Sequence, residues 1–167
     1  MARNELDNPT REGYVELAKQ FVGIKEGGAE HTALISKYND IQRKYKVTTK
    51  SAWCAIFVSY INLLSGGNHV SSSFPNAIKC TTMVDCFRIK KRYRNNDSSF
   101  IPQYGDIVFY DWDNDGKVDH VGIISDVSNG NNPTMLVVEG NYSNAVKVRS
   151  VKYNDSRIIG YGLPRFR

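Results

Sequence analysis

The sequence predicts an α+β domain in which N-terminal helices pack against a C-terminal antiparallel β-sheet. Over roughly the first 90 residues, apolar side chains recur at the three- and four-residue spacing of amphipathic helices. From Ile101 onward the spacing changes to two, in short runs separated by turn-forming residues, which is typical of strands. No linker, internal repeat or low-complexity tract interrupts the 167 residues, so we expect a single domain, 1–167, with its core at 10–166.

Three amphipathic helices are expected besides a more apolar central one. The first covers residues 9–22 with Thr10 as its N-cap, and the second runs from His31 to about Tyr45. His31 stands at the start of the second helix, where a partly exposed histidine is the usual case and a place in a cleft is the alternative. A later helix covers residues 76–89 and follows NHVSSSFPN, a loop that holds His69.

The stretch SAWCAIFVSYINLL, residues 51–64, predicts a buried central helix, because its body contains few polar side chains. Ser51 is the expected N-cap, which makes Cys54 the third helical residue, among unpaired N–H groups at the positive end of the helix dipole. A thiol at such a position ionises more easily. Since a free cysteine on an apolar helix is more often an inert hydrophobe, the interpretation of Cys54 as a nucleophile depends on later segments.

A β-hairpin in the second half of the chain supplies those segments. Strands are expected at 106–111, 119–126, 134–140, 145–152 and 157–163. If the second and third pair about a turn at Asn129 and Gly130, His120 lies directly opposite Glu139, and both share one face. Asn141, two residues further on, points to the same face. A one-residue change of register would send Glu139 to the other face.

Five segments in fixed order carry a resemblance to a known family: AWCAIFVS, YGDIVFYDW, DHVGII, VVEGNYS and IIGYGLPRF. They resemble the CHAP domains, cysteine- and histidine-dependent amidohydrolases and peptidases, which are papain-like relatives of the NlpC/P60 peptidoglycan hydrolases. The resemblance spans residues 10–166 and implies the papain-like α+β fold. By position it implies Cys54 as nucleophile, His120 as base, and Glu139 with Asn141 as the groups that orient His120. Glu139 followed by Asn141 favours CHAP over NlpC/P60, whose third position is usually histidine or an amide.

The resemblance implies cysteine-dependent hydrolysis of an amide in peptidoglycan, at the N-acetylmuramoyl-L-alanine bond or at a stem or cross-bridge bond. In this chemistry Cys54 attacks the carbonyl, and His120 protonates the leaving amine and later activates water. The backbone N–H of Cys54 is the expected oxyanion donor. The reaction needs no cofactor. Two alternatives keep part of this pattern: a cysteine peptidase or deamidating effector acting on a protein, and a calcium-stabilised binding module with a vestigial site.

An acidic segment just before His120 has the spacing of calcium loops. The pattern DxDxDGxxD supplies four carboxylates, from Asp111, Asp113, Asp115 and Asp119. The Lys117 carbonyl is a further candidate ligand, whereas position twelve of the pattern is Gly122 instead of the glutamate of an EF-hand. The sequence leaves two interpretations open, a structural calcium site within a hairpin and a polar hairpin turn at residues 114–116.

Composition and cysteine usage are those of a globular domain, with 41% hydrophobic and 23% charged residues. Three cysteines cannot all pair. Cys80 and Cys86, six residues apart on a predicted helix, point to different faces, so buried thiols are expected instead of a disulfide.

Charge and termini give expectations about partners and localisation. The net charge is +5, and the densest basic run, Arg88 to Arg94, is interpreted as a solvated helix end, with nucleic-acid binding as the less favoured alternative. The resemblance implies peptidoglycan as the partner and the bacterial cell wall as the place of action, and we expect a monomer without nucleic-acid partners or membrane insertion. The start MARNELDNPT lacks an apolar signal segment, and a phage lysin, an effector and a trimmed secreted protein all remain as origins.

Overall fold

The computed structural model describes residues 8–66 and 73–167, and this part of the chain forms four helices followed by six strands. Residues 1–7 and the predicted loop residue His69 lie outside the described ranges. The elements are α1 (Arg11–Lys19), α2 (Ala29–Ile41), α3 (Cys54–Leu64), α4 (Cys80–Ile89), β1 (Tyr93–Asn95), β2 (Ile107–Tyr110), β3 (His120–Ser128), β4 (Thr134–Glu139), β5 (Lys147–Lys152) and β6 (Ile158–Gly162).

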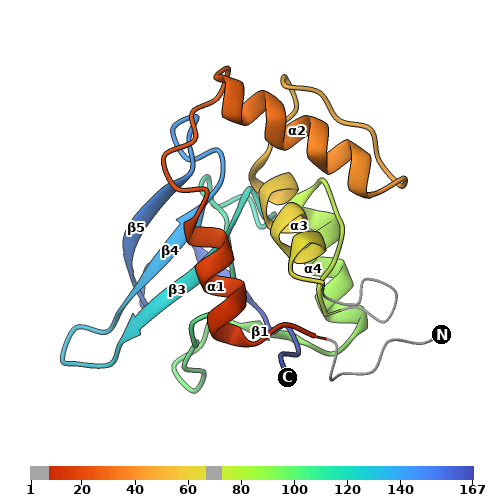
Figure 1. Ribbon diagram of the computed structural model, residues 1–167. Coiled ribbons are helices and arrows are strands. Elements are labelled where there is room, and N and C mark those ends of the chain that lie inside the picture. Colours follow the sequence, from red (N-terminus) through yellow and green to blue (C-terminus); the bar gives the residue numbers. More distant parts are fainter. Residues whose placement is uncertain (1–7, 67–72) are drawn as a thin grey trace.

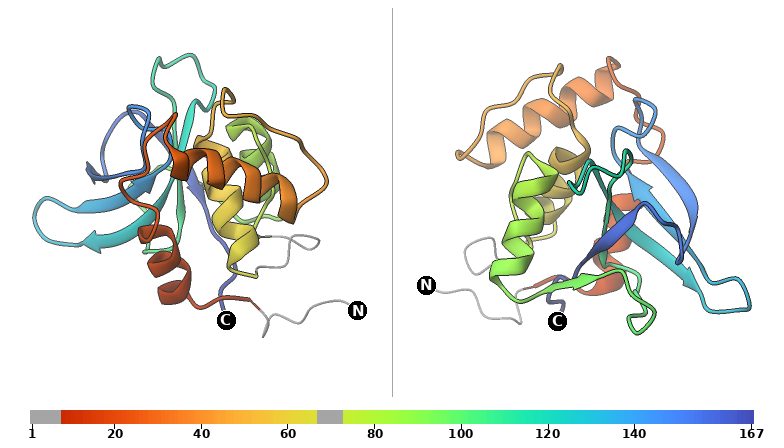
Figure 2. Two further views of the ribbon diagram at one scale, coloured as in Figure 1. Left: turned by 45° about the horizontal axis from the view of Figure 1, so that its top comes forward. Right: turned by 180° about the vertical axis from the view of Figure 1, so that it is seen from behind.

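The strands form one antiparallel sheet in the order β1-β6-β2-β3-β4-β5. Helices α1 and α3 pack on β3, α4 packs on β1, and α2 lies across α3 (Figures 1 and 2). The predicted α+β class, with helices first and strands second, is confirmed. None of the helices in the described ranges is long and apolar enough to cross a membrane.

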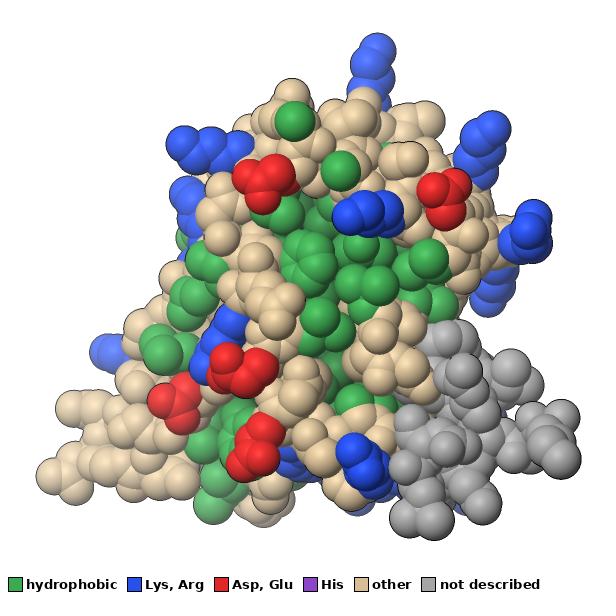
Figure 3. All heavy atoms as spheres, viewed as in Figure 1, with side chains coloured by type: hydrophobic (Ala, Val, Ile, Leu, Met, Phe, Trp, Pro, Cys, Tyr) green, Lys and Arg blue, Asp and Glu red, His purple; other side chains and the backbone are tan. Residues whose placement is uncertain are grey.

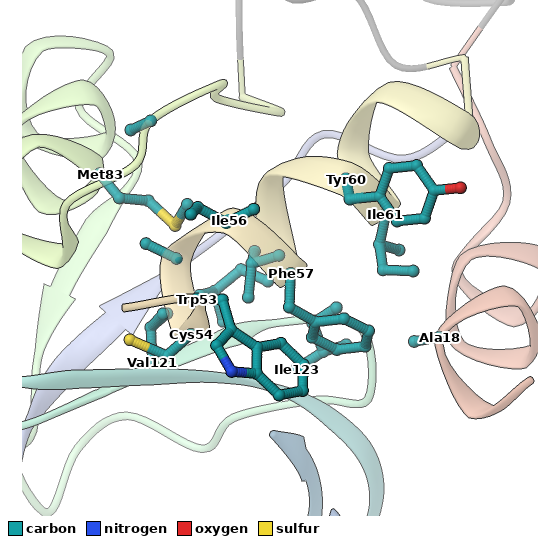
Figure 4. Close-up of a cluster of buried hydrophobic side chains, with 14 of the residues drawn as sticks. Ala18, Trp53, Cys54, Ile56, Phe57, Tyr60, Ile61, Met83, Val121 and Ile123 are labelled. Carbon is teal, nitrogen blue, oxygen red and sulfur yellow. The ribbon is translucent and has the colours of Figure 1, made fainter. Parts of the chain in front are cut away.

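The sheet separates two groups of buried side chains. The main core joins all four helices to the sheet face that carries Phe109, Val121 and Ile123. Trp53 and Phe57 are fully buried there and pack between α3 and the sheet (Figure 4). A smaller cluster, which includes Val108, Tyr110, Ile124 and Val137, covers the other face. His120 is paired with Tyr110, so its side chain lies on this second face, at the end of β3.

The start of the central helix differs from the prediction. The Thr10 cap of α1 is confirmed, since its hydroxyl accepts a hydrogen bond from the Gly13 N–H at 3.1 Å. In α3, however, the N-cap is Trp53 and Cys54 is the first helical residue instead of the third. The Ser51 hydroxyl instead accepts from the Thr48 N–H at 3.1 Å, which closes a turn before the helix begins. Cys54 still lies in the first turn, where the dipole argument applies.

The basic run is more structured than predicted. Arg88 lies in the last turn of α4, but Tyr93 and Arg94 belong to β1, a strand that the sequence pattern does not predict. Arg92 turns inward and donates to the Leu163 carbonyl at 2.8 Å. The run therefore joins α4 to the sheet edge, and only part of it is a solvated helix end.

His31 is buried, so the expectation of partial exposure is wrong. Its ring lies 4.7 Å from the Trp53 ring, and its Nδ1 accepts from the Gly27 N–H at 3.2 Å. The Trp53 indole in turn donates to Glu26 at 2.9 Å. This network fixes the segment just before Cys54 and gives His31 a structural explanation.

Candidate active site

The predicted nucleophile lies at the junction of two helices. Cys54 begins α3 and Cys80 begins α4, and the two Sγ atoms are 3.4 Å apart. Cys54 is 9% exposed and Cys80 is 8% exposed, so both residues of this sulfur pair are nearly enclosed. Figure 4 shows Cys54 at the first turn of α3 beside Val121 of β3. Two helix N-termini therefore converge on one pair of thiols.

The surroundings of Cys54 favour its ionised form. A hydrogen bond with the Cys80 thiol lowers the pKa of Cys54 well below the usual value, and burial opposes this effect. The hydrogen bond and charge of His120 and the Ala55 N–H lower the pKa of Cys54 further. The pKa of Cys80 is raised, by its contact with Cys54 and by burial. These shifts favour ionisation of Cys54 before Cys80, an arrangement in which the Cys80 thiol is the hydrogen-bond donor.

His120 is held by aromatic rings. It is 5% exposed, and its ring centroid lies 5.5 Å from that of Trp112, 5.8 Å from Tyr110 and 6.1 Å from Tyr142. Its Nε2 is buried and 3.7 Å from Glu139 Oε1, beyond hydrogen-bonding distance, and has no hydrogen-bond partner in the described part of the chain. Because Nε2 faces the carboxylate, Nδ1 is the nitrogen available to the Cys54 thiolate.

The hairpin register places Glu139 near His120 but not directly opposite it. Ile123 pairs with Val138 across β3 and β4, and one more step of this ladder sets Glu139 opposite Gly122. The predicted pairing of His120 with Glu139 is therefore wrong by two residues. The turn between the strands is longer than the two residues assumed, and a bulge follows Ile124. Because the error is an even number of residues, both side chains keep the predicted common face.

Glu139 is occupied by an arginine. Its side chain is fully buried, and Arg149 of β5 donates two hydrogen bonds to it, from Nε to Oε2 and from Nη2 to Oε1, the second of 2.9 Å. Burial disfavours the charged form of Arg149, but the hydrogen bonds and charge of Glu139 outweigh this and raise the pKa of Arg149. Its guanidinium also lies 4.2 Å from the Tyr142 ring centre and 5.2 Å from that of Trp112. Glu139 thus contacts both a permanent cation and the imidazole.

Asn141 does not occupy the position of a residue that orients His120 by direct contact. It follows β4, has a backbone φ of 56°, and forms no hydrogen bond with His120 in the described ranges. The next residue, Tyr142, brings its ring to His120 instead. The structure therefore brings together Cys54, His120 and Glu139, with Asn141 at the margin of the group.

Two glycines in the resembling segments make this packing sterically feasible. A Cβ on Gly122 would meet Glu139 Cγ at 2.7 Å, so its absence makes room for the carboxylate. A Cβ on Gly140 would meet Phe57 Cβ of α3 at 2.4 Å. Gly140 thus allows α3 to lie directly on the end of β4. These close approaches explain the glycines of DHVG and EGN physically.

The acidic loop gathers three of its four predicted ligands. Asp111, Asp113 and Asp115 each place one carboxylate oxygen within 4.8 Å of the others. Asp119 lies outside this group because it closes the hairpin, where its Oδ2 accepts from the Trp112 N–H at 2.7 Å. Asn114 and Gly116 have positive φ, which confirms the predicted turn chemistry. Both Asp111 oxygens accept loop N–H groups, Oδ1 from Asp115 at 3.2 Å and Oδ2 from Gly116 at 2.8 Å, and a carboxylate oxygen can accept more than one bond.

Sequence reasoning missed two residues of the site, Cys80 and Arg149. Cys80 lies near the start of the predicted helix 76–89, and Cys54 lies in the first turn of its own predicted helix, so this similar position is the signal that was available. Arg149 lies on the same face of β5 as Lys147, the ladder partner of Glu139, so its closeness follows only once the β4–β5 register is known.

Comparison with known proteins identifies the site-bearing part of the chain. Residues 45–141, more than half of the 167, match the family model of the CHAP domain. The matched range includes Cys54, Cys80, His120, Glu139 and Asn141, and Arg149 lies beyond it. No curated protein and no solved structure matches the chain.

Proposed function

This chain belongs to the CHAP domain family, and we propose that it is a cysteine-dependent hydrolase that cleaves amide bonds of bacterial peptidoglycan. Family membership supports a hydrolase of the peptidase or amidase type. The observation that supports the finer proposal is the position of Cys54 at the start of α3, where Cys80 and His120 lower its pKa, with Glu139 Oε1 3.7 Å from Nε2 of His120. This is the order of nucleophile, base and carboxylate used in cysteine hydrolases.

In the proposed reaction, the Cys54 thiolate attacks the amide carbonyl and forms a thioester as the amine leaves. His120 gives its proton to the departing amine and then takes one from the water that hydrolyses the thioester. Glu139 stabilises the imidazolium that is present before the amine leaves and that forms again when His120 takes the proton from water. The N–H groups of the first turn of α3 have no intrahelical acceptors, and that of Cys54 serves as oxyanion donor.

The charge of the protein suits a wall polymer. A net charge of +5 favours association with anionic wall components. The Lys and Arg side chains visible in Figure 3 lie mostly around the outline of that face and do not form one continuous patch. Peptidoglycan as the partner, a monomeric state and action at the bacterial wall remain part of the proposal, and nucleic-acid binding does not.

Digestion of purified sacculi tests the proposed function. Wild-type protein is expected to release soluble fragments from Gram-positive or Gram-negative sacculi, and Cys54→Ala to release none. Mass spectrometry of the fragments then names the bond: a free L-alanine amine marks an amidase, and a new terminus within the stem or bridge marks an endopeptidase. If wild-type protein releases nothing, with calcium present or absent, the wall substrate is wrong, and a protein substrate becomes the better proposal.

The reactivity of the three thiols checks the nucleophile without any substrate. Because the pKa of Cys54 is lowered while those of Cys80 and Cys86 are raised, iodoacetamide is expected to modify Cys54 first. The thiolate is the form present above its pKa, so the rate at Cys54 should persist at a pH where an ordinary thiol no longer reacts. Peptide mapping of the alkylated protein measures this between about pH 4 and pH 9, which is roughly the range of thiol pKa values in proteins. Equal rates at all three cysteines would contradict the assignment.

We also propose that Asp111, Asp113 and Asp115 hold a calcium ion that rigidifies the loop before His120. Calcium prefers carboxylate and carbonyl oxygens as ligands. A ligand that binds only the folded state raises the free energy of unfolding by about 2.7 kcal/mol when its free concentration is about a hundred times its Kd. Thermal unfolding is expected to shift upward with calcium chloride and much less with magnesium chloride. The double variant Asp113→Asn/Asp115→Asn should lose that difference. Identical unfolding curves for wild-type protein with either salt would show that the loop is a turn alone.

A further inference from the structure

The contact between Cys54 and Cys80 is the feature of the site that amide hydrolysis does not require. A nucleophile, a base and an orienting group suffice for that chemistry, yet a second cysteine lies with its sulfur 3.4 Å from the first. Both side chains are more than nine-tenths buried, and each begins a different helix. The two sulfurs thus face each other in a shared enclosure, whereas Cys86, six residues along α4, is partly exposed and away from it.

We propose that Cys54 and Cys80 form a site of reversible oxidation, in which a hydroperoxide converts them to a disulfide that withdraws the nucleophile from use. The sulfurs need to approach by about 1.4 Å to reach the bond length of a disulfide. Such a movement is local, because each cysteine is a terminal residue of its helix. Formation of the disulfide does not depend on the proposed hydrolysis, whereas the expected loss of activity rests on it.

The reaction balances as two steps. The Cys54 thiolate attacks one oxygen of the hydroperoxide, the O–O bond breaks, and hydroxide or alkoxide leaves, so that Cys54 becomes a sulfenic acid. The Cys80 sulfur then attacks the Cys54 sulfur, the S–O bond breaks, and the oxygen departs as water with the proton of the Cys80 thiol. The two thiols lose two electrons and the peroxide gains them. A dithiol reductant returns both cysteines to thiols.

Proximity makes the second step faster than its competitors. A sulfenic acid that reacts with a second peroxide molecule is oxidised to sulfinic acid, which thiols do not reduce. A neighbouring thiol already in van der Waals contact with the sulfur captures the sulfenic acid first. Cys80 therefore preserves the enzyme as well as switching it off, because the disulfide is the recoverable product.

The experiment uses peroxide-treated protein in the Cys86→Ser background, since tryptic cleavage after Lys50, Lys79 and Arg88 otherwise leaves Cys80 and Cys86 on one peptide. Peptides 51–79 and 80–88 are expected to appear joined, lighter by two hydrogen atoms than their sum. Cys54 should resist iodoacetamide until dithiothreitol is added, and sacculus digestion should be lost and regained in parallel. Wild-type protein should give the same two peptides joined.

Two variants of Cys80 keep the result interpretable. Cys80→Ser retains a hydrogen-bond donor to Cys54 but cannot form a disulfide, and Cys80→Ala has neither property. Both are expected to lose the joined peptides and to accumulate irreversibly oxidised Cys54 that dithiothreitol does not rescue. The proposal is overturned if peroxide leaves both cysteines open to alkylation, or if the disulfide forms between two protein molecules instead of within one. It is also overturned if dithiothreitol restores the activity of Cys80→Ser as fully as that of the wild-type protein. A linked pair in a protein without wall activity would refute the proposed function and leave the oxidation site intact.

Discussion

His120→Ala is expected to lower kcat/KM for the wall substrate about a thousandfold, the middle of the range for loss of a general acid and base. The imidazole has two tasks in the proposed mechanism, protonation of the leaving amine and activation of water, and no other histidine contacts Cys54 in the described ranges. His31 is buried against Trp53 instead. The same substitution should raise the pH needed for alkylation of Cys54, because His120 helps to lower the pKa of that thiol.

The alkylation profile of Cys54 separates this role from a structural one. Loss of the imidazole should move alkylation of Cys54 to higher pH, whereas a variant that keeps His120 should not show this shift. His69→Ala is the matched control, because His69 is the third histidine of the sequence and is predicted to lie in a loop. A loss of only a few-fold in His120→Ala, or an alkylation profile of Cys54 that does not change, would contradict the assignment of His120 as the base.

The fold class, and the places of Cys54 and His120 on their elements, could be predicted from local patterns, whereas the roles of nucleophile and base came from the resemblance to CHAP domains. An apolar helix that begins near Cys54 and an alternating strand that begins at His120 are both visible in the periodicity of the chain. The predicted start of the helix was wrong by two positions, because the Ser51 hydroxyl accepts a hydrogen bond from Thr48 in the preceding turn. A cap depends on which of several nearby hydroxyls finds an N–H group, and local sequence does not decide that.

Non-local contacts account for what the sequence left out. The closeness of Cys80 to Cys54 depends on how α4 docks beside α3, and that docking is determined by packing of side chains such as Met83 and Ile56 (Figure 4). The place of Glu139 depends on a bulge and a longer turn, neither of which has a strong sequence signal. Even so, the correct face was predicted, because alternation along a strand tolerates errors of two residues.

Arg149→Met is expected to lower the free energy of unfolding by about 3–5 kcal/mol, the usual cost of removing one partner of a buried ion pair. Glu139 is fully buried, and its two oxygens both accept from Arg149. Without the guanidinium, the ion pair that remains to the carboxylate in the described ranges is its 3.7 Å contact with Nε2 of His120. Methionine keeps much of the aliphatic length of arginine beside Tyr142 and Trp112, so most of the loss is attributable to charge. Denaturant unfolding at neutral pH measures the change.

Arg157 offers a matched control for this prediction. Its guanidinium lies 5.0 Å from the Trp112 ring centre and pairs with Asp155, but its side chain is 49% exposed whereas that of Arg149 is 16% exposed. Arg157→Met should therefore cost less than about 1 kcal/mol, as surface ion pairs do. The double variant Glu139→Met/Arg149→Met should be more stable than Arg149→Met alone, because it removes the unpaired charge. Equal losses in Arg149→Met and Arg157→Met, or no rescue in the double variant, would mean that packing over Trp112, and not the buried charge of Glu139, explains the presence of Arg149.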